Sequence, residues 1–171
     1  MPSPTLVTDL LLTDAFLIKG AVDPKKKRLS TCLDELRGQF VTVRDATLVD
    51  VRSRNVIQTP KILVNVDRVV LAHEFLDTAS DTFQKNLSQD RELSPIRVFH
   101  VGSLNFEVAG EARPGSYELN NPNKRFFIIE RPKIKGLETK GEDDDLAVLE
   151  RLDYVIVSKS RLSYIYDFNE G

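Results

Sequence analysis

The chain has 171 residues, of which 41% are apolar and 29% charged, and its formal net charge is −2 at pH 7. These values are ordinary for a globular protein and suit one domain or two small ones. They exclude a global basic field that would attract nucleic acid or an anionic membrane. No apolar run reaches the about 18 residues of a membrane-spanning helix. The single Cys32 favours a reducing compartment, so a cytoplasmic location is expected.

The first part of the chain predicts an arm, a strand and a helix. Residues 1–13 are expected to be a loosely ordered arm or a short added element, and Phe16–Gly20 is expected to be a strand. The apolar stripe in residues 29–36 predicts a short helix. Thr31 and Asp34 have the spacing of a capping box at the start of that helix.

Apolar segments bounded by turn residues predict further strands in this part of the chain. They are Phe40–Val43 continuing into Thr47–Val51, then Val56–Thr59, Ile62–Val66 and Val69–Glu74. Asp45 and Ala46 are expected to form a bend or a bulge. Pro60 limits pairing, so the strand before it is expected at the edge of a sheet.

The composition changes in residues 77–94, which predict a connector. Ala79, Phe83 and Leu87 lie four residues apart there, which is the spacing of a short amphipathic helix. Residues 95–171 then predict a second group of strands. They are Ile96–Val101, Arg125–Glu130, Leu146–Leu149, Tyr154–Val157 and Leu162–Phe168.

The order of the apolar runs indicates that residues 1–76 and 95–171 are two copies of one unit. QFVTVRDATLVDV at 39–51 and RFFIIERPKIKGL at 125–137 lie 86 positions apart, and the same offset carries 62–75 onto 148–161. Gly102 is expected to take the role of Gly20. The predicted fold class is mainly β (α+β), with two tandem small β-barrel or sheet units and one or two short helices. The alternative is one β-rich domain with chance similarity.

Three segments carry a resemblance to a group of small bacterial β-rich proteins. They are RLSxxL at 28–33, FVTVRDA at 40–46 and VNVDRVVLAHE at 64–74. The group has no characterised activity, so the resemblance implies a β-rich unit and no chemistry. The chain departs from the group's pattern at Thr31 and Asp34, where Asp and Asn are usual.

A looser resemblance is to Sm-like small barrels, which combine a short helix, bent strands and a turn between the last two strands. The RNA-binding motifs of that family do not carry over. The first motif requires Asn four residues after an Asp, and Val49 stands at that distance from Asp45. The second requires Arg-Gly at the final turn, where this chain has Asp67-Arg68 or Asp153-Tyr154. The resemblance therefore implies a small-barrel architecture without the nucleotide pocket.

Two charged clusters and one aromatic pair are candidate binding residues. The basic turn, a candidate for phosphate or another anion, comprises Lys25, Lys26, Lys27 and Arg28. The acidic cluster, a candidate for a basic partner or for the basic turn of another subunit, comprises Glu142, Asp143, Asp144 and Asp145. The aromatic pair of the last predicted strand, Tyr164 and Tyr166, is a candidate interaction site. The alternatives are solvated loops for the clusters and a core row for the tyrosines.

No catalytic residue, metal site or cofactor is predicted. The acidic cluster lacks the alternating spacing and the glycine of a calcium loop. The chain contains no Gly-rich phosphate loop, CxxC pair, HExxH or GxSxG. His73 and Glu74 are neighbours in a predicted strand and point to opposite faces, which disfavours a catalytic pair.

The predicted function is therefore a non-catalytic cytoplasmic binding or assembly module, which is homo-oligomeric or part of a protein complex. Two alternatives remain open. One is a nucleic-acid or nucleotide-binding small barrel that uses the basic turn. The other is an enzyme whose site joins residues distant in the sequence, for example His100 with a carboxylate.

Overall fold

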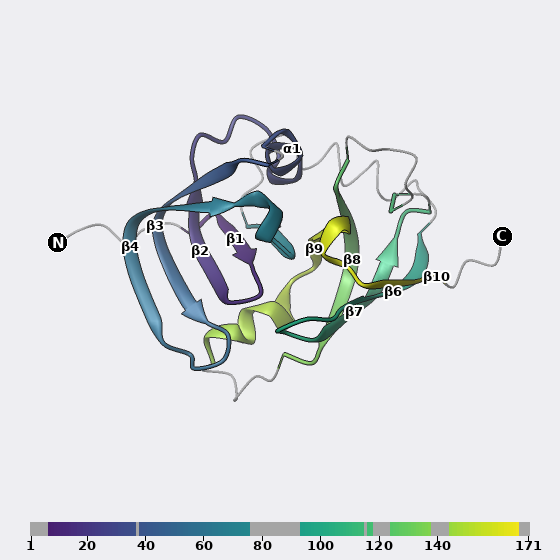
Figure 1. Cartoon of the computed structure of the whole chain (residues 1–171). Helices are drawn as coiled ribbons and strands as arrows, with labels where there is room; N and C mark the ends of the chain where they lie inside the picture. The colour runs from purple at the N-terminus through teal and green to yellow at the C-terminus, as the bar shows by residue number, and fades with distance from the viewer. Residues whose placement is uncertain are drawn as a thin grey trace.

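The computed structural model describes residues 7–36, 38–75, 93–114, 116–117, 124–137 and 144–167. These residues form one antiparallel sheet in the order β10-β6-β7-β8-β9-β5-β1-β2-β3-β4, which is open at both ends. Figure 1 shows the strands of the first half on one side of the molecule and those of the second half on the other. None of the helices in the described ranges is long and apolar enough to cross a membrane.

Within the described residues each half contains five strands. The first half contains β1 (Asp9–Leu12), β2 (Phe16–Val22), α1 (Leu29–Glu35), β3 (Phe40–Asp50), β4 (Val56–Asn65), the 3₁₀ segment η1 (Val66–Arg68) and β5 (Leu71–Glu74). The second contains β6 (Ser94–His100), β7 (Phe106–Ala112), β8 (Phe126–Lys135), η2 (Asp145–Arg151), β9 (Tyr154–Ser158), η3 (Lys159–Arg161) and β10 (Tyr164–Asp167).

The mainly β class predicted from the sequence is confirmed, but two closed barrels are not supported, because all ten strands belong to one open sheet. The predicted arm contains β1, in which every residue is buried between β2 and β5. Leu146–Leu149 belongs to η2 and is not a strand. The predicted helix of the connector lies outside the described residues.

The capping box predicted at the start of α1 is also wrong. The N-cap residue is Arg28, whose side chain makes no capping hydrogen bond, and the first helical N–H, that of Leu29, donates to Glu74 Oε2 at 3.2 Å. Asp34 instead points away from its own helix to the second half of the chain. Its Oδ1 accepts hydrogen bonds from the backbone N–H groups of Arg125, at 2.8 Å, and Phe126, at 3.2 Å. The start of β8 is thereby fixed against α1.

Each half has the same neighbour order, in which the first strand lies between the fifth and the second. The order is β5-β1-β2-β3-β4 in the first half and β10-β6-β7-β8-β9 in the second. The register agrees as well, since Phe40 faces Asn65 as Phe126 faces Ser158. The predicted offset of 86 positions is thus right for β3 and β8. It is wrong for the strands that follow, because β9 corresponds to β4 and β10 to β5.

A bulge at the same place strengthens the correspondence of the halves. The register of β2 with β3 skips Gly20, and the register of β7 with β8 skips Gly110. The bulged strands carry a positive φ at Asp45 (49°) and at Arg131 (50°), which are 86 positions apart. Gly110, rather than the predicted Gly102, therefore occupies the place of Gly20.

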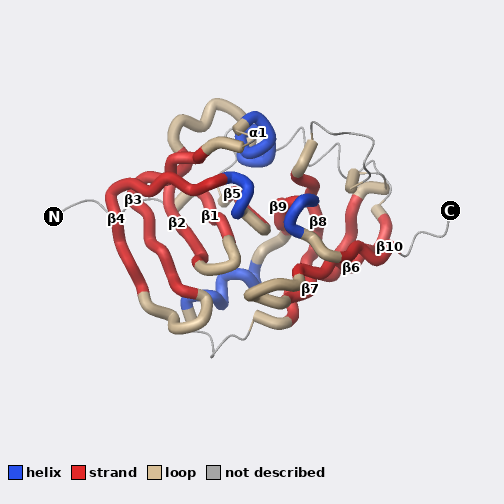
Figure 2. Tube along the Cα trace, in the orientation of Figure 1, coloured by secondary structure: helices blue, strands red, loops and turns tan. Residues whose placement is uncertain are grey.

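The two halves share their apolar interior. β5 pairs with β9 through Leu71 opposite Val157 and Ala72 opposite Ile156. One buried cluster joins Leu71 to residues of β6–β9, and a second joins the helix α1 to Phe126 and Ile156. Figure 2 shows the helical segments between the two groups of strands. Each of the two clusters therefore contains residues of both halves.

The bulge glycines yield a first prediction. A Cβ atom on Gly20 would lie 2.7 Å from the carbonyl oxygen of Arg44, and one on Gly110 would lie 2.7 Å from that of Glu130. Gly20→Ala and Gly110→Ala should each lower the free energy of unfolding by about 1–3 kcal/mol, because backbone must move to admit a methyl group. Gly102→Ala, whose Cβ meets only ordinary contacts, is the control and should cost less than about 0.5 kcal/mol. Denaturant titration measures the free energy of unfolding of all three variants. A loss for Gly102→Ala as large as that for Gly110→Ala would contradict the assignment of Gly110 to the place of Gly20.

A second prediction concerns Asp34. Burial raises the pKa of this carboxyl above its ordinary value, although the two backbone hydrogen bonds oppose that rise. Asp34→Ala leaves two N–H groups without their acceptor and should cost about 1–3 kcal/mol in the free energy of unfolding. Asp34→Asn keeps an oxygen acceptor and removes the half-buried charge, so it should cost clearly less. Equal destabilisation by both variants would show that the carboxylate charge is what holds β8.

Candidate functional site

The predicted basic turn is divided by the fold, because Lys25 turns inward. Its Nζ lies 2.7 Å from Asp9 Oδ1 and 2.7 Å from Glu74 Oε2, and the three side chains are 7%, 1% and 1% exposed. Asp9 and Glu74 face each other across β1 and β5, so the ammonium separates two like charges. Burial disfavours this ammonium, but its hydrogen bonds to both carboxylates outweigh burial and raise the pKa of Lys25. Lys25 is therefore a protonated structural residue.

The other three cations of the basic turn do not converge on one point with Lys25. Lys26 is exposed. Lys27 forms an exposed ion pair with Glu35, with 2.5 Å between Nζ and Oε1. Arg28 is the N-cap residue of α1. The turn thus offers no cradle in which four cations surround a phosphate.

The acidic cluster is described only in part, since Glu142 and Asp143 lie outside the described residues. Asp144 precedes η2 and accepts a hydrogen bond from the N–H of Leu146 at 3.0 Å. Its Oδ1 also lies 2.9 Å from Nε of Arg54, in the turn between β3 and β4, and the Asp144 side chain is 2% exposed. This ion pair joins the halves within one chain. Asp145 is exposed at the start of η2.

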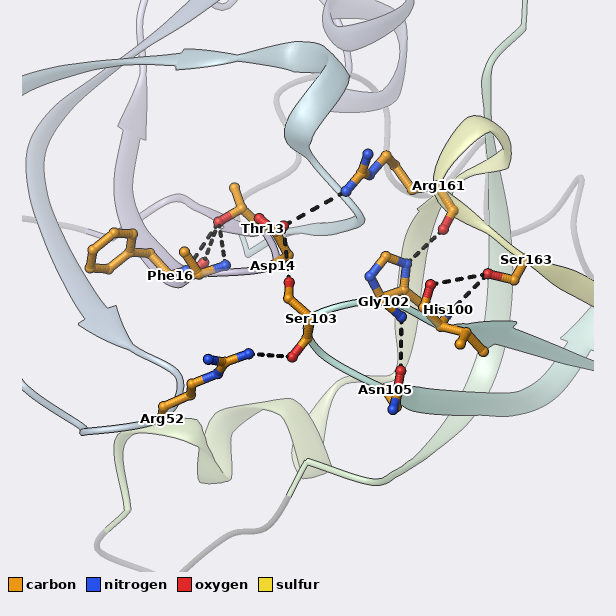
Figure 3. A network of polar contacts seen from close by, with 12 residues as sticks. Thr13, Asp14, Phe16, Arg52, His100, Gly102, Ser103, Asn105, Arg161 and Ser163 are labelled. Atoms are coloured by element: carbon orange, nitrogen blue, oxygen red, sulfur yellow. Dashed lines mark hydrogen bonds and ion pairs between the residues drawn. The ribbon is translucent and has the colours of Figure 1, made fainter.

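A polar network lies where the β6–β7 turn approaches the first half (Figure 3). Ser103 donates to Asp14 Oδ2 at 3.3 Å and its carbonyl accepts from Arg52. The guanidinium of Arg161 lies 3.9 Å from the same Asp14 oxygen. A hollow of about 220 Å³ beside them is lined by Asp14, Ala15, Asp50, Val51, Arg52 and Ser103. Within the described residues its one hydroxyl–carboxylate contact is that of Ser103 with Asp14, which is 3.3 Å long and exposed, and no histidine lines the hollow.

Both histidines are buried and face the chain's own backbone. His100 Nδ1 lies 2.6 Å from the carbonyl oxygen of Arg161, and its Nε2 has no hydrogen-bond partner among the described residues. His73 Nδ1 lies 2.9 Å from the carbonyl oxygen of Tyr154, and its ring packs against those of Tyr154 and Phe75. Burial lowers the pKa of His73, which keeps the imidazole neutral. Neither ring is placed for general acid–base chemistry.

Metal and thiol chemistry gain no support either. In the described part of the chain, no group of three or more His, Cys, Asp or Glu side chains is arranged to hold a metal ion. Cys32 is buried on the inner face of α1, and burial raises the pKa of its thiol, which disfavours a reactive thiolate.

The open edges of the sheet, β4 and β10, carry most of the exposed large apolar side chains in the described ranges. Ten large apolar side chains are exposed in the described ranges, and six of them lie on these two strands. The six are Val56 (50%), Ile57 (51%), Leu63 (55%), Tyr164 (66%), Ile165 (38%) and Tyr166 (56%). The predicted Tyr164 and Tyr166 thus lie at an edge and not in a core row. The β4 residues were not predicted as a site, although Pro60 had indicated an edge.

An open edge can bind a further strand. Its outer row of N–H and C=O groups is unpaired within the sheet, and exposed apolar side chains add surface to bury. β4 and β10 occupy opposite ends of the strand order, so the molecule has two such edges. Comparison of the chain with family models, curated proteins and solved structures found no match.

A third prediction follows from His73. In the unfolded chain the imidazole has a pKa of about 6.5, whereas in the folded chain burial lowers its pKa. As the pH falls through about 6.5, protons therefore bind preferentially to the unfolded chain. Stability should therefore fall on acidification, by at most about 1.4 kcal/mol per pH unit from this residue. Urea titrations between neutral and mildly acidic pH should show that His73→Phe, which keeps the ring contacts, reduces the slope. An unchanged slope would assign the acid sensitivity to other groups.

Proposed function

We propose that this chain is a non-catalytic binding or assembly module whose partners are proteins. The contacts are made by its two open sheet edges. The observation that carries this proposal is the concentration of exposed apolar side chains on β4 and β10. Proteins commonly blunt such edges with charges, short strands or covering loops. β4 extends over ten residues and is exposed along most of its length, and such blunting residues occur in it only at Pro60 and Lys61.

We further infer that residues 1–76 and 95–171 are two copies of one small barrel-like unit joined by the connector. The equal strand order, the equal register and the paired bulges support this inference. A cytoplasmic location fits the single buried Cys32. The tandem arrangement matters for function because each unit presents an edge of its own.

The two alternative functions have no specific support. A nucleotide site at the basic turn would need Lys25, which is held by Asp9 and Glu74. An enzyme would need an acid, a base or a nucleophile at a cavity, and the hollow beside Asp14 offers only the long, exposed contact of the Ser103 hydroxyl with the Asp14 carboxylate.

A fourth prediction tests the module. A photoreactive amino acid placed at position 63 or 165 in the full chain should give discrete crosslinked protein products in the cell. The same amino acid at position 133, which is exposed on β8 and belongs to neither edge strand, is the control and should give far less. Mass spectrometry identifies the products. Equal yields at all three positions, or none at the edges, would contradict a role for the edges.

A further inference from the structure

We propose that the partner is a second copy of this chain. In this assembly β4 of one copy pairs antiparallel with β10 of the next. The pairing repeats the β5–β9 contact that joins the two halves inside each chain. This inference rests on the proposed function and names the partner of the same edges.

The internal contact supplies the template. In each half the fourth and fifth strands end the run: β4 and β5 in the first half, β9 and β10 in the second. Inside the chain, the fourth strand of the second half pairs with the fifth strand of the first. The edges left over are the fourth strand of the first half and the fifth strand of the second. One copy therefore presents the same kind of pair that it has already joined internally.

Burial at equivalent positions shows what the free edges lack. Val155–Val157 of β9 are at most 2% exposed, whereas at the equivalent positions of β4 Leu63 is 55% exposed and Val64 is 6% exposed. Leu71–His73 of β5 are at most 5% exposed, whereas the equivalent Tyr164–Tyr166 of β10 are between 38% and 66% exposed. The free edges carry apolar or aromatic side chains at these positions, as an occupied contact requires.

The direction of the backbone also agrees. Across the internal contact the N–H of Ser158 donates to the carbonyl of Val70 at 2.9 Å. The next residue along, Lys159, donates to the carbonyl of Arg125 on the other side. In the first half Val66 donates in the same way to Gln39, so Asn65, which takes the place of Ser158, turns its N–H to the open side.

The register between copies follows by substitution of equivalent residues. Leu71 opposite Val157 becomes Tyr164 opposite Val64, and Ala72 opposite Ile156 becomes Ile165 opposite Leu63. The N–H of Asn65 then reaches the carbonyl of Ser163. No charged side chain occupies any of the four directly paired positions. The pairing is head to tail, since it uses two different edges, so it propagates until it closes into a ring or continues as a filament.

The experiment uses two complementary variants of the full chain. Leu63→Lys places a charge on β4 and Ile165→Lys places one on β10. By light scattering, wild type should have a mass of at least two chains of 19.4 kDa each. Each variant alone should be monomeric. An equimolar mixture should give a species of two chains and nothing larger, because one intact β4 and one intact β10 remain.

Val101→Lys is the matched control, because Val101 is 56% exposed, as Leu63 is at 55%, and lies outside both edges. It should assemble as wild type does. Leu63→Pro and Ile165→Pro form a second pair, since each removes an N–H that faces the open side and no hydrogen bond of its own sheet. Amide exchange in wild type should also slow at residues 63 and 165 as the protein concentration rises.

Three outcomes would overturn the inference. They are a wild type that stays monomeric at high concentration, a single variant that still dimerises, and a mixture that stays monomeric while wild type assembles. A dimer of one variant alone would mean that an edge pairs with its own copy. A monomeric wild type whose edges still crosslink to another protein would refute self-assembly and leave the module standing. A monomer without such crosslinks would refute both.

Discussion

The arrangement of the whole sheet depends on the pairing of β5 with β9. It is the one strand pairing that joins the halves within the described residues, and it consists of two residue pairs. The side chains of Leu71 and Val157 belong to the same buried cluster, so parting the strands would expose apolar surface as well as unpaired backbone groups. Short as it is, this contact makes one interior out of two incomplete ones.

The sequence predicts the mainly β class and the correspondence of β3 with β8, but not the correspondence of the strands that follow. Both the success and the failure have local causes. The correspondence of β3 with β8 survives because the bulge residues Asp45 and Arg131 keep their spacing from a leading Phe. It fails further along because η2 is inserted before β9, and a short apolar run such as 146–149 does not distinguish a strand from a helical turn. β1 escaped prediction because a strand buried on both faces shows no alternation.

The candidate site was less predictable, because exposure is set by residues far apart in the sequence. Lys25 belongs to a run of cations that suggests a solvated turn, yet its partners Asp9 and Glu74 come from β1 and β5. A buried charge is tolerated only when it is paired, and only the fold brings this pair together. The exposure of Tyr164 likewise depends on which strand ends the sheet, which alternation of side chains cannot tell.

The shortness of the β5–β9 contact has a consequence for how the protein responds to its own abundance. Inside a chain the two halves are tethered, and a tether of this kind confers an effective concentration on the order of millimolar. Two residue pairs are then enough to hold the strands together. The same geometry between separate molecules has no tether, so its occupancy follows the cellular concentration of the chain. Folding would be insensitive to dilution, while any assembly through β4 and β10 would be reversible and dosage-dependent.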